Sequence, residues 1–131
     1  MSTKPKRDLI ELEFPIRCSP SILYNYLQTG SGLQEWFAHK VTTRSRTDYD
    51  FEFDDGTISK AKLLKAVNNK LVRFKWENSE ENEFLEMEII VDELTEDVAI
   101  KITEYCDENE KRGLIELWHS QIEALRDVVG S

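Results

Sequence analysis

Apolar and polar residues alternate at every second position through much of the chain, which is the pattern of half-buried β-strands. The alternation predicts strands over residues 8–14, 39–43, 47–53, 57–67, 71–76, 84–91 and 98–103. It slips near Leu64, where a bulge is expected. Asp55-Gly56 and Asn68-Asn69 lie between strands and are typical of hairpin turns. Because each later strand follows its neighbour after a short connection, the pattern predicts an antiparallel meander.

Helical spacing appears in two places along the chain. After the first strand, Ser19-Pro20 predicts a capped helix start, Gly30-Ser31-Gly32 predicts its end, and residues 33–37 predict a second short helical turn. Near the C-terminus, residues 111–129 predict one long amphipathic helix. Its apolar face carries Leu114, Leu117, Trp118, Ile122, Leu125 and Val129.

These elements predict an α+β fold in a single domain, residues 1–131, with residues 1–7 as a flexible N-terminus. A curved antiparallel sheet of about six to seven strands would be covered on one face by the long C-terminal helix, with two short helices after strand one. Neither the sheet nor the helix can bury its apolar face alone. A helix lying across a curved sheet can leave a cavity beneath it, so the architecture predicts a pocket.

Composition favours a globular protein with a heavily charged surface. The 131 residues are 40% hydrophobic and 33% charged, and no apolar run reaches the length of a membrane span. The charged N-terminus has no apolar stretch behind it, which argues against a signal peptide and predicts a cytoplasmic location. Cys18 and Cys106 lack metal-type spacing and are expected to be reduced thiols, with a disulfide as the alternative.

Charge is distributed unevenly along the chain. The formal net charge of −9 argues against binding of nucleic acid. Residues 77–110 hold 14 acidic residues and a single basic residue, Lys101. Two interpretations stay open: an acidic surface that selects a basic protein partner, or charges that keep strand edges and turns soluble.

The residue types needed for catalysis are not grouped in any recognisable motif. The two histidines are His39, expected at the solvent-facing start of a strand or at a pocket entrance, and His119, expected at the flank of the long helix. No inward-facing run shows paired carboxylates, and no metal-ligand spacing, nucleophile motif or phosphate-binding loop is present. We therefore expect a protein that is not an enzyme and has no cofactor.

Aromatic residues are numerous for this length, and some of them are candidates for a ligand site. Aromatic side chains commonly line pockets for small molecules, but they also fill the gap between a helix and a concave sheet. The candidate ligand-binding residues are those expected where the second helix, the middle of the sheet and the long helix converge: Trp36, Phe37, Phe74, Trp76, Met87 and Trp118.

Several short segments, in this order, carry a resemblance that covers roughly residues 9–129. They are Ser19-Pro20, Leu23-Tyr24, residues 33–37, Asp55-Gly56, residues 70–76, and Trp118 with Leu125. The chain resembles the helix-grip fold of the START and pollen-allergen (SRPBCC) superfamily, in the branch related to activators of the heat-shock chaperone ATPase. Residues 43–48 lack the glycine-rich turn common in that branch, which indicates a divergent member.

The resemblance implies a cavity between the long helix and the sheet. Its members include carriers of lipids and sterols, polyketide cyclases, hormone receptors and chaperone activators, and fold alone does not choose among these functions. The first hypothesis is a non-enzymatic domain that binds a small hydrophobic molecule. The second is a protein-interaction or chaperone-cofactor module that uses its acidic sheet surface, and the third is a cyclase- or hydrolase-type enzyme. The sequence does not indicate the oligomeric state.

Overall fold

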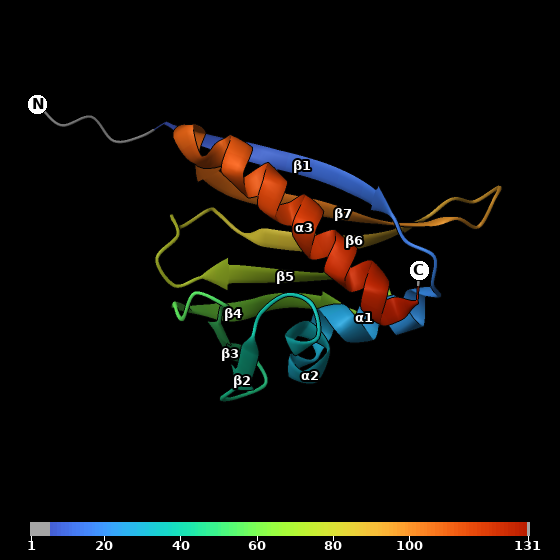
Figure 1. The fold of residues 1–131 in the computed structure, drawn as a ribbon, viewed down its shortest axis with the longest axis horizontal. Coiled ribbons are helices and arrows are strands. Elements are labelled where there is room, and N and C mark those ends of the chain that lie inside the picture. The colour runs from blue at the N-terminus through green and yellow to red at the C-terminus, as the bar shows by residue number, and fades with distance from the viewer. Residues whose placement is uncertain (1–5, 131) are drawn as a thin grey trace, which may run out of the picture.

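The computed structural model describes residues 6–130 of the chain. Within this range seven strands form one sheet, and helices follow the first and the last strand (Figure 1). In chain order the elements are β1 (Arg7–Pro15), α1 (Pro20–Gln28), α2 (Gly30–Gln34), β2 (Lys40–Thr43), β3 (Asp48–Glu52), β4 (Ile58–Val67), β5 (Leu71–Trp76), β6 (Leu85–Val91), β7 (Val98–Asp107), the 3₁₀ helix η1 (Glu108–Glu110) and α3 (Lys111–Val129).

The sheet is antiparallel throughout, with the strand order β1-β7-β6-β5-β4-β3-β2. From β2 to β7 every strand pairs with the next along the chain, so the predicted meander is confirmed. The first strand closes the other edge by pairing with the last, with Arg7 opposite Asp107 and Pro15 opposite Ala99. Helix α3 crosses one face of this sheet, as Figure 1 shows, and the predicted α+β helix-grip architecture is confirmed.

The connection between the two short helices differs from the prediction. Ser19 caps α1 as expected, since its hydroxyl accepts a hydrogen bond from the backbone N–H of Ile22. Gly30 and Gly32, however, begin α2 instead of ending a helix, because the Thr29 hydroxyl caps α2 by accepting from Gly32 N–H at 2.9 Å. A Cβ at Gly32 would lie 2.4 Å from the carbonyl oxygen of Asn25, so this glycine is required by close packing of the two helices.

The turns and the bulge lie where the sequence predicts them. The register between β4 and β5 shifts between Leu63 and Lys65, which places the irregularity at Leu64. Gly56 and Asn69 adopt positive φ angles of 87° and 59° in the two predicted hairpin turns. β7 is longer than predicted, because its alternation of buried and exposed residues continues through Glu104 and Cys106.

Side chains fill the space beneath the middle of α3. Trp118, Ile122 and Leu125 from the helix are buried against the inner face of the sheet. The ring of Phe37 lies 5.8 Å from that of Trp118 and 5.3 Å from that of Phe51, centroid to centroid. The central contact between helix and sheet is therefore a packed aromatic and aliphatic core.

Leu117 differs from its neighbours on α3. The sequence places it on the apolar face of the helix, yet its side chain is 53% exposed. None of the helices in residues 6–130 combines the length and apolar character needed to span a membrane. Of the expected flexible N-terminus, residues 1–5 lie outside the described residues, whereas Arg7 begins β1.

Candidate functional site

One face of α3 is lined by two open clefts that meet at Leu117. The first, here called the Glu104 cleft, has a volume of about 660 Å³, and its α3 residues are Gly113, Leu114 and Leu117. The second, here called the Gln121 cleft, has a volume of about 820 Å³, and its α3 residues are Leu117, Ser120, Gln121 and Ala124. These positions recur every three or four residues, so they form a single stripe along the helix.

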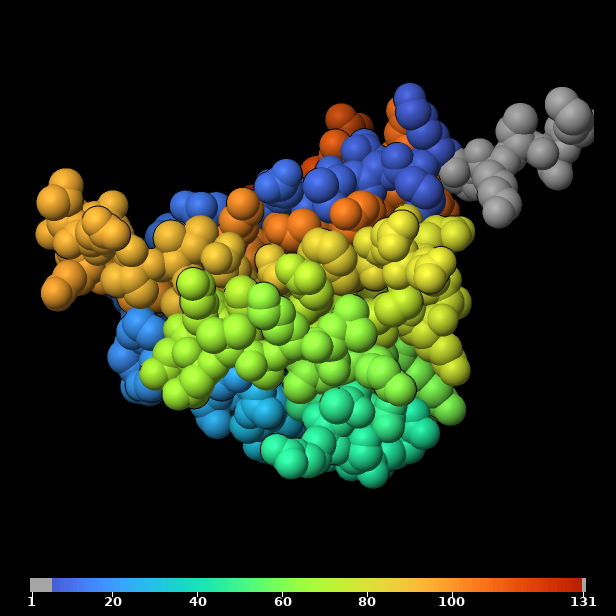
Figure 2. Space-filling view, turned by 180° about the vertical axis from the view of Figure 1, so that it is seen from behind, coloured from blue at the N-terminus to red at the C-terminus, as the bar shows by residue number. Residues whose placement is uncertain are grey.

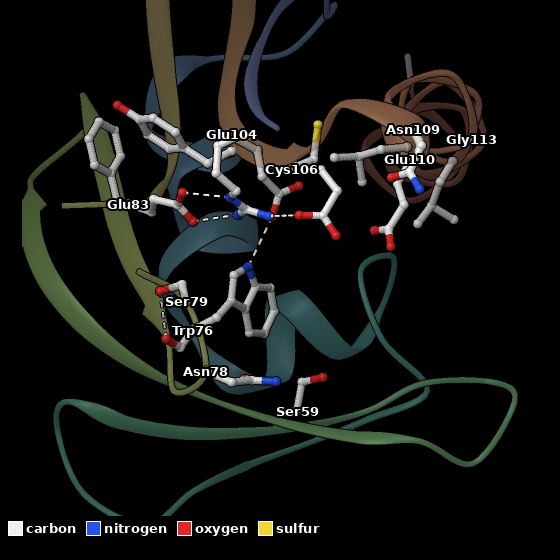
Figure 3. Close-up of a pocket in the computed structure, with 16 residues that line it drawn as sticks. Ser59, Trp76, Asn78, Ser79, Glu83, Glu104, Cys106, Asn109, Glu110 and Gly113 are labelled. Carbon is white, nitrogen blue, oxygen red and sulfur yellow. Dashed lines mark hydrogen bonds and ion pairs between the residues drawn. The ribbon is translucent and has the colours of Figure 1, made fainter. Parts of the chain in front are cut away.

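The Glu104 cleft is built from elements that are far apart in the sequence (Figure 3). Its apolar lining comes from the end of β5, the start of α3 and the segment before β6, through Trp76, Leu114, Leu117 and Phe84. Its polar lining comes mainly from β1, the loop between β5 and β6, β7 and η1. These polar residues are Arg7, Ser59, Asn78, Ser79, Glu83, Glu104, Asp107, Asn109 and Glu110.

Glu104 is a buried carboxylate on the inner face of the sheet, on the same strand face as the buried Ile100 and Ile102. Its residue is only 8% exposed, and its two oxygens each accept one indole N–H, from Trp76 and from Trp118, both at 2.9 Å. Burial raises the pKa of Glu104, while the two indole hydrogen bonds act in the opposite direction. The arrangement holds a titratable group rigidly between two aromatic rings at the wall of the cleft.

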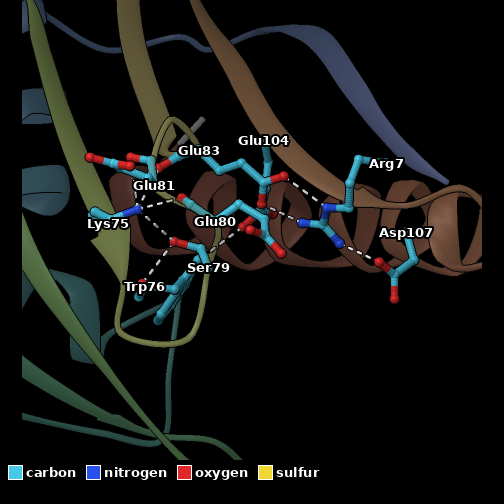
Figure 4. Close-up of polar contacts among 9 residues, drawn as sticks. All are labelled: Arg7, Lys75, Trp76, Ser79, Glu80, Glu81, Glu83, Glu104 and Asp107. Atoms are coloured by element: carbon cyan, nitrogen blue, oxygen red, sulfur yellow. Dashed lines mark hydrogen bonds and ion pairs between the residues drawn. The ribbon is translucent and has the colours of Figure 1, made fainter. Parts of the chain in front are cut away.

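Arg7, on the edge strand β1, lines one side of the cleft and contacts two carboxylates (Figure 4). Its guanidinium pairs with both oxygens of Glu83, the Nε to Oε2 distance being 2.8 Å, and also with Asp107. The hydrogen bonds from Arg7 are the main reason that the pKa of Glu83 is lowered. Glu83 is therefore held as an ionised partner of Arg7, and the guanidinium is already engaged by two carboxylates.

The loop between β5 and β6 is fixed by a second cation. The Lys75 ammonium donates to the Ser79 hydroxyl at 3.2 Å and to the backbone carbonyls of Glu80 and Glu81 at 2.5 Å and 3.2 Å (Figure 4). The loop therefore presents Glu83 to Arg7 from a defined position. Electrostatic contacts organise this wall of the cleft, whereas aromatic packing organises its floor.

The structure separates the six predicted ligand-site residues into two groups. Trp76 lines the Glu104 cleft, and Trp36 and Phe37 line the Gln121 cleft. Phe74, Met87 and Trp118 are buried behind them, at most 2% exposed. The Phe37 and Trp76 rings are stacked 6.3 Å apart, so the aromatic lining of the two clefts is in contact.

The histidines and cysteines do not form a reactive constellation. His39 is exposed, and its Nδ1 lies 3.8 Å from the carboxylate of Asp54, which is also exposed, at the rim of the Gln121 cleft. His119 is exposed on α3, with its ring edge-on to Phe14. Cys18 and Cys106 are free thiols. Residues 6–130 contain no group of three or more His, Cys, Asp or Glu side chains placed to hold a metal ion.

Sequence reasoning missed Glu104, Leu117 and Arg7 as lining residues. In the strand predicted over residues 98–103, Ile100 and Ile102 lie on one face, and the same alternation continues to Glu104, so an acid at an inward position was the available signal. Leu117 is apolar and correctly spaced, and only the tertiary arrangement shows that its part of α3 has no facing element. Arg7 lies on β1, and the local sequence pattern does not show that β1 pairs with β7.

The outer face of the sheet, which Figure 2 views from behind, carries ion pairs between neighbouring segments. Within the acidic segment 77–110, Glu86 accepts from Arg73 at 2.7 Å across β5 and β6, and Lys101 lies 3.3 Å from Glu11 on β1. Near the β2 edge of the same sheet, Arg44 Nε lies 3.1 Å from Asp50. The acids of the central strands are thus partly neutralised across the sheet, and unpaired negative charge concentrates in the loops.

The meander, the short helices after β1 and the long helix over the sheet define an α+β helix-grip protein. The family model for the START-like superfamily domain matches residues 1–131, so the chain belongs to the START-like superfamily. Among curated proteins, none matches this sequence.

Solved structures show the same fold. The solution structure of BfR322 from Bacteroides fragilis is 28% identical, with a TM-score of 0.64 over 94% of this chain and 91% of that one. The Aha1 dimer from Colwellia psychrerythraea is 19% identical, with a TM-score of 0.77 over 93% of this chain and 96% of that one. Protein MLL2253 from Mesorhizobium loti is 13% identical, with a TM-score of 0.77 over 94% and 97%.

Proposed function

We propose that the protein is a non-enzymatic binding domain that holds a small hydrophobic molecule in the Glu104 cleft, between α3 and the sheet. The observation that carries the proposal is the lining of this cleft, which places the apolar surface of Trp76, Leu114 and Leu117 beside the buried carboxylate of Glu104. Pockets for small molecules commonly have volumes of roughly 300–1,000 Å³ and an apolar lining with few oriented polar groups. The cleft's volume of about 660 Å³ lies within this range, and Trp76, Leu114 and Leu117 supply apolar surface beside its polar residues.

The exposure of Leu117 supports the same proposal. A leucine that is 53% exposed on the stripe of α3 facing a cleft leaves apolar surface that a ligand would cover. In this proposal Trp76 contacts the ligand directly, while Trp118 and Phe74 hold the wall behind it. Trp36 and Phe37 extend the apolar surface into the Gln121 cleft, so that a longer molecule could lie along the helix.

The alternative, an interaction module with an acidic sheet surface, has less support from the contacts. Cross-strand cations already face acids of the outer face, as in the pair formed by Arg73 and Glu86. The Aha1 dimer from Colwellia psychrerythraea shares the fold at 19% identity, which carries no partner over to this chain.

A titration followed by ¹H–¹⁵N correlation spectra tests the proposal. The probe is the neutral amphiphile 2-(naphthalen-2-yl)ethanol. We expect saturable shifts of the Trp76 indole N–H and of the backbone amides of Leu114 and Leu117. Leu117→Gln should weaken the binding at least fivefold, with little loss of stability because the side chain is half exposed.

The matched control is Leu94→Gln. Leu94 is 94% exposed in the loop between β6 and β7, which projects from the end of the sheet opposite to α3's first turn (Figure 1). This change removes the same apolar side chain from a place outside both clefts and should leave the affinity unaltered. Equal affinities of Leu117→Gln and the unaltered protein, or shifts confined to residues outside the cleft, would contradict the proposal.

A further inference from the structure

Glu104 gives the Glu104 cleft a chemical preference that an apolar pocket alone would lack. An ionised carboxylate offers about four acceptor positions, and the two indole N–H groups occupy one on each oxygen. Because the residue is 8% exposed, a charge placed against it is weakly screened by solvent. A ligand group that meets this carboxylate should therefore carry hydrogen-bond donors and positive charge.

The remaining charges around the cleft point to the same preference. Its lining contains four acidic side chains, those of Glu83, Glu104, Asp107 and Glu110, and one basic side chain, that of Arg7. Arg7 is already paired with Glu83 and Asp107, so it is a poor receptor for an anionic ligand. The Arg7 guanidinium therefore has little capacity left to bind an anion. A carboxylate or phosphate group that entered the cleft would meet net negative charge.

Trp76 adds a second favourable element for a cation. Its half-buried indole lines the cleft while its N–H holds Glu104, so the ring and the carboxylate are adjacent in the wall (Figure 3). Cations are attracted to the faces of indole rings, most strongly where solvent is excluded. An aromatic ring beside a buried carboxylate can contact both the apolar body and the charged end of one molecule.

We infer that the Glu104 cleft selects amphiphilic amines, with the protonated amine at the Glu104 carboxylate and the apolar body against Trp76, Leu114 and Leu117. This inference rests on the proposed binding function and adds the class of ligand. It distinguishes the cleft from a site for fatty acids or other lipophilic anions, which share the apolar body but have the opposite charge.

Three probes with one apolar body test the inference by isothermal titration calorimetry at pH 7.5. They are 2-(naphthalen-2-yl)ethylamine, the corresponding alcohol, and naphthalene-2-acetate. We expect the amine to bind at least tenfold more tightly than the alcohol, and the carboxylate more weakly than either. Glu104→Gln, which keeps the side-chain size but removes the charge, should reduce the preference for the amine to threefold or less.

The control variant is Glu93→Gln, which makes the same change in net charge at an exposed position in the loop between β6 and β7. It should retain the preference for the amine. A second measurement is made on the unaltered protein, so it does not depend on the folding of a variant. In 0.5 M NaCl the preference should persist, since the general field of the acidic surface is screened while a contact at the buried carboxylate is screened much less.

The outcomes separate the inference from the proposed function. If amine and alcohol bind equally, and both depend on Leu117, the cleft binds hydrophobic molecules but the inference is wrong. It is also wrong if Glu104→Gln and Glu93→Gln lower the amine affinity equally, or if 0.5 M NaCl abolishes the preference. If none of the three probes binds at the cleft at millimolar concentration, both the inference and the proposed function fail.

Discussion

Glu86 and Glu104 lie on opposite faces of the sheet and have opposite kinds of partner. On the outer face, Glu86 lies beside the guanidinium of Arg73 on the neighbouring strand, and solvent reaches both groups. On the inner face, Glu104 is buried and its hydrogen-bond partners are two uncharged indoles. A cation pairs with the first acid, whereas the second accepts hydrogen bonds from neutral indoles, and the ligand amine proposed above would be its cationic partner.

This difference determines where substitutions should matter. Ion pairs on a solvent-exposed face contribute little, because water competes for both partners and salt screens them. A buried polar network is sensitive to the loss of any member, since the remaining groups lose partners in a low-dielectric environment. The inner network of Glu104, Trp76 and Trp118 should accordingly dominate both stability and binding.

The largest expected effect comes from Trp118→Ala. The indole is 2% exposed, packs against Phe37 and donates to Glu104, so its removal leaves a cavity and an unsatisfied carboxylate oxygen. We expect the free energy of unfolding to fall by about 3–5 kcal/mol, as for other buried aromatic residues. Chemical denaturation measures this loss, and Leu117→Ala on the exposed part of the same stripe is the control. A loss below about 1 kcal/mol would show that Trp118 is not packed core.

An intermediate effect is expected from the pH dependence of Glu104→Gln. The pKa of Glu104 is raised above the value of 4.5 for an unperturbed glutamate. Ionisation of Glu104 is therefore less favourable in the folded protein than in the unfolded chain, so the stability linked to this group is fully present below the unfolded pKa and is lost as pH rises through the folded pKa. The stability of the unaltered protein relative to Glu104→Gln should be greatest at acidic pH and should decrease as pH increases.

Glu83→Gln provides the contrast in the same cleft. Arg7 lowers the pKa of Glu83, so its stabilising contribution is present above the unfolded pKa and is lost as pH falls. Unfolding free energies from pH 3 to 8 should therefore give slopes of opposite sign for the two variants, each relative to the unaltered protein. Slopes of the same sign would contradict this assignment of the two carboxyl groups.

The smallest effect is expected on the outer face. A double-mutant cycle with Arg73→Ala and Glu86→Gln should give a coupling energy below about 1 kcal/mol, which decreases further in 0.5 M NaCl. The Arg73 guanidinium also lies 4.3 Å from the centre of the Phe84 ring, so the single change at Arg73 should exceed the coupling. A coupling energy well above this limit would remove the contrast between the two faces.

The sequence was sufficient to predict most of the fold. Period-two alternation identified the strands, and the irregularity at Leu64 was visible because alternation slips there. The start of α2 was misjudged because glycines usually interrupt helices, whereas Gly32 is needed for close packing and Thr29 supplies the cap. A local pattern does not contain that contact between two helices.

The site was less accessible to sequence reasoning. Trp76, Trp36 and Phe37 were identified as candidates and lie in the two clefts, although their role in binding stays a prediction. Arg7 and Glu104 come from the two ends of the chain, and their proximity depends on the pairing of β1 with β7. The exposure of Leu117 likewise depends on which part of α3 lacks a facing element.

The pairing of β1 with β7 has a consequence for folding during synthesis on the ribosome. β1 is synthesised first, yet Arg7 and its partner Asp107 are 100 residues apart, and β7 is β1's only neighbour in the described sheet. Contacts of such long sequence separation form late in folding, since the intervening chain must first be ordered. A nascent chain that ends before Val98 therefore holds an unpaired first strand and no Glu104 cleft, and the proposed binding site can be complete only after β7 and the first turns of α3 have been synthesised.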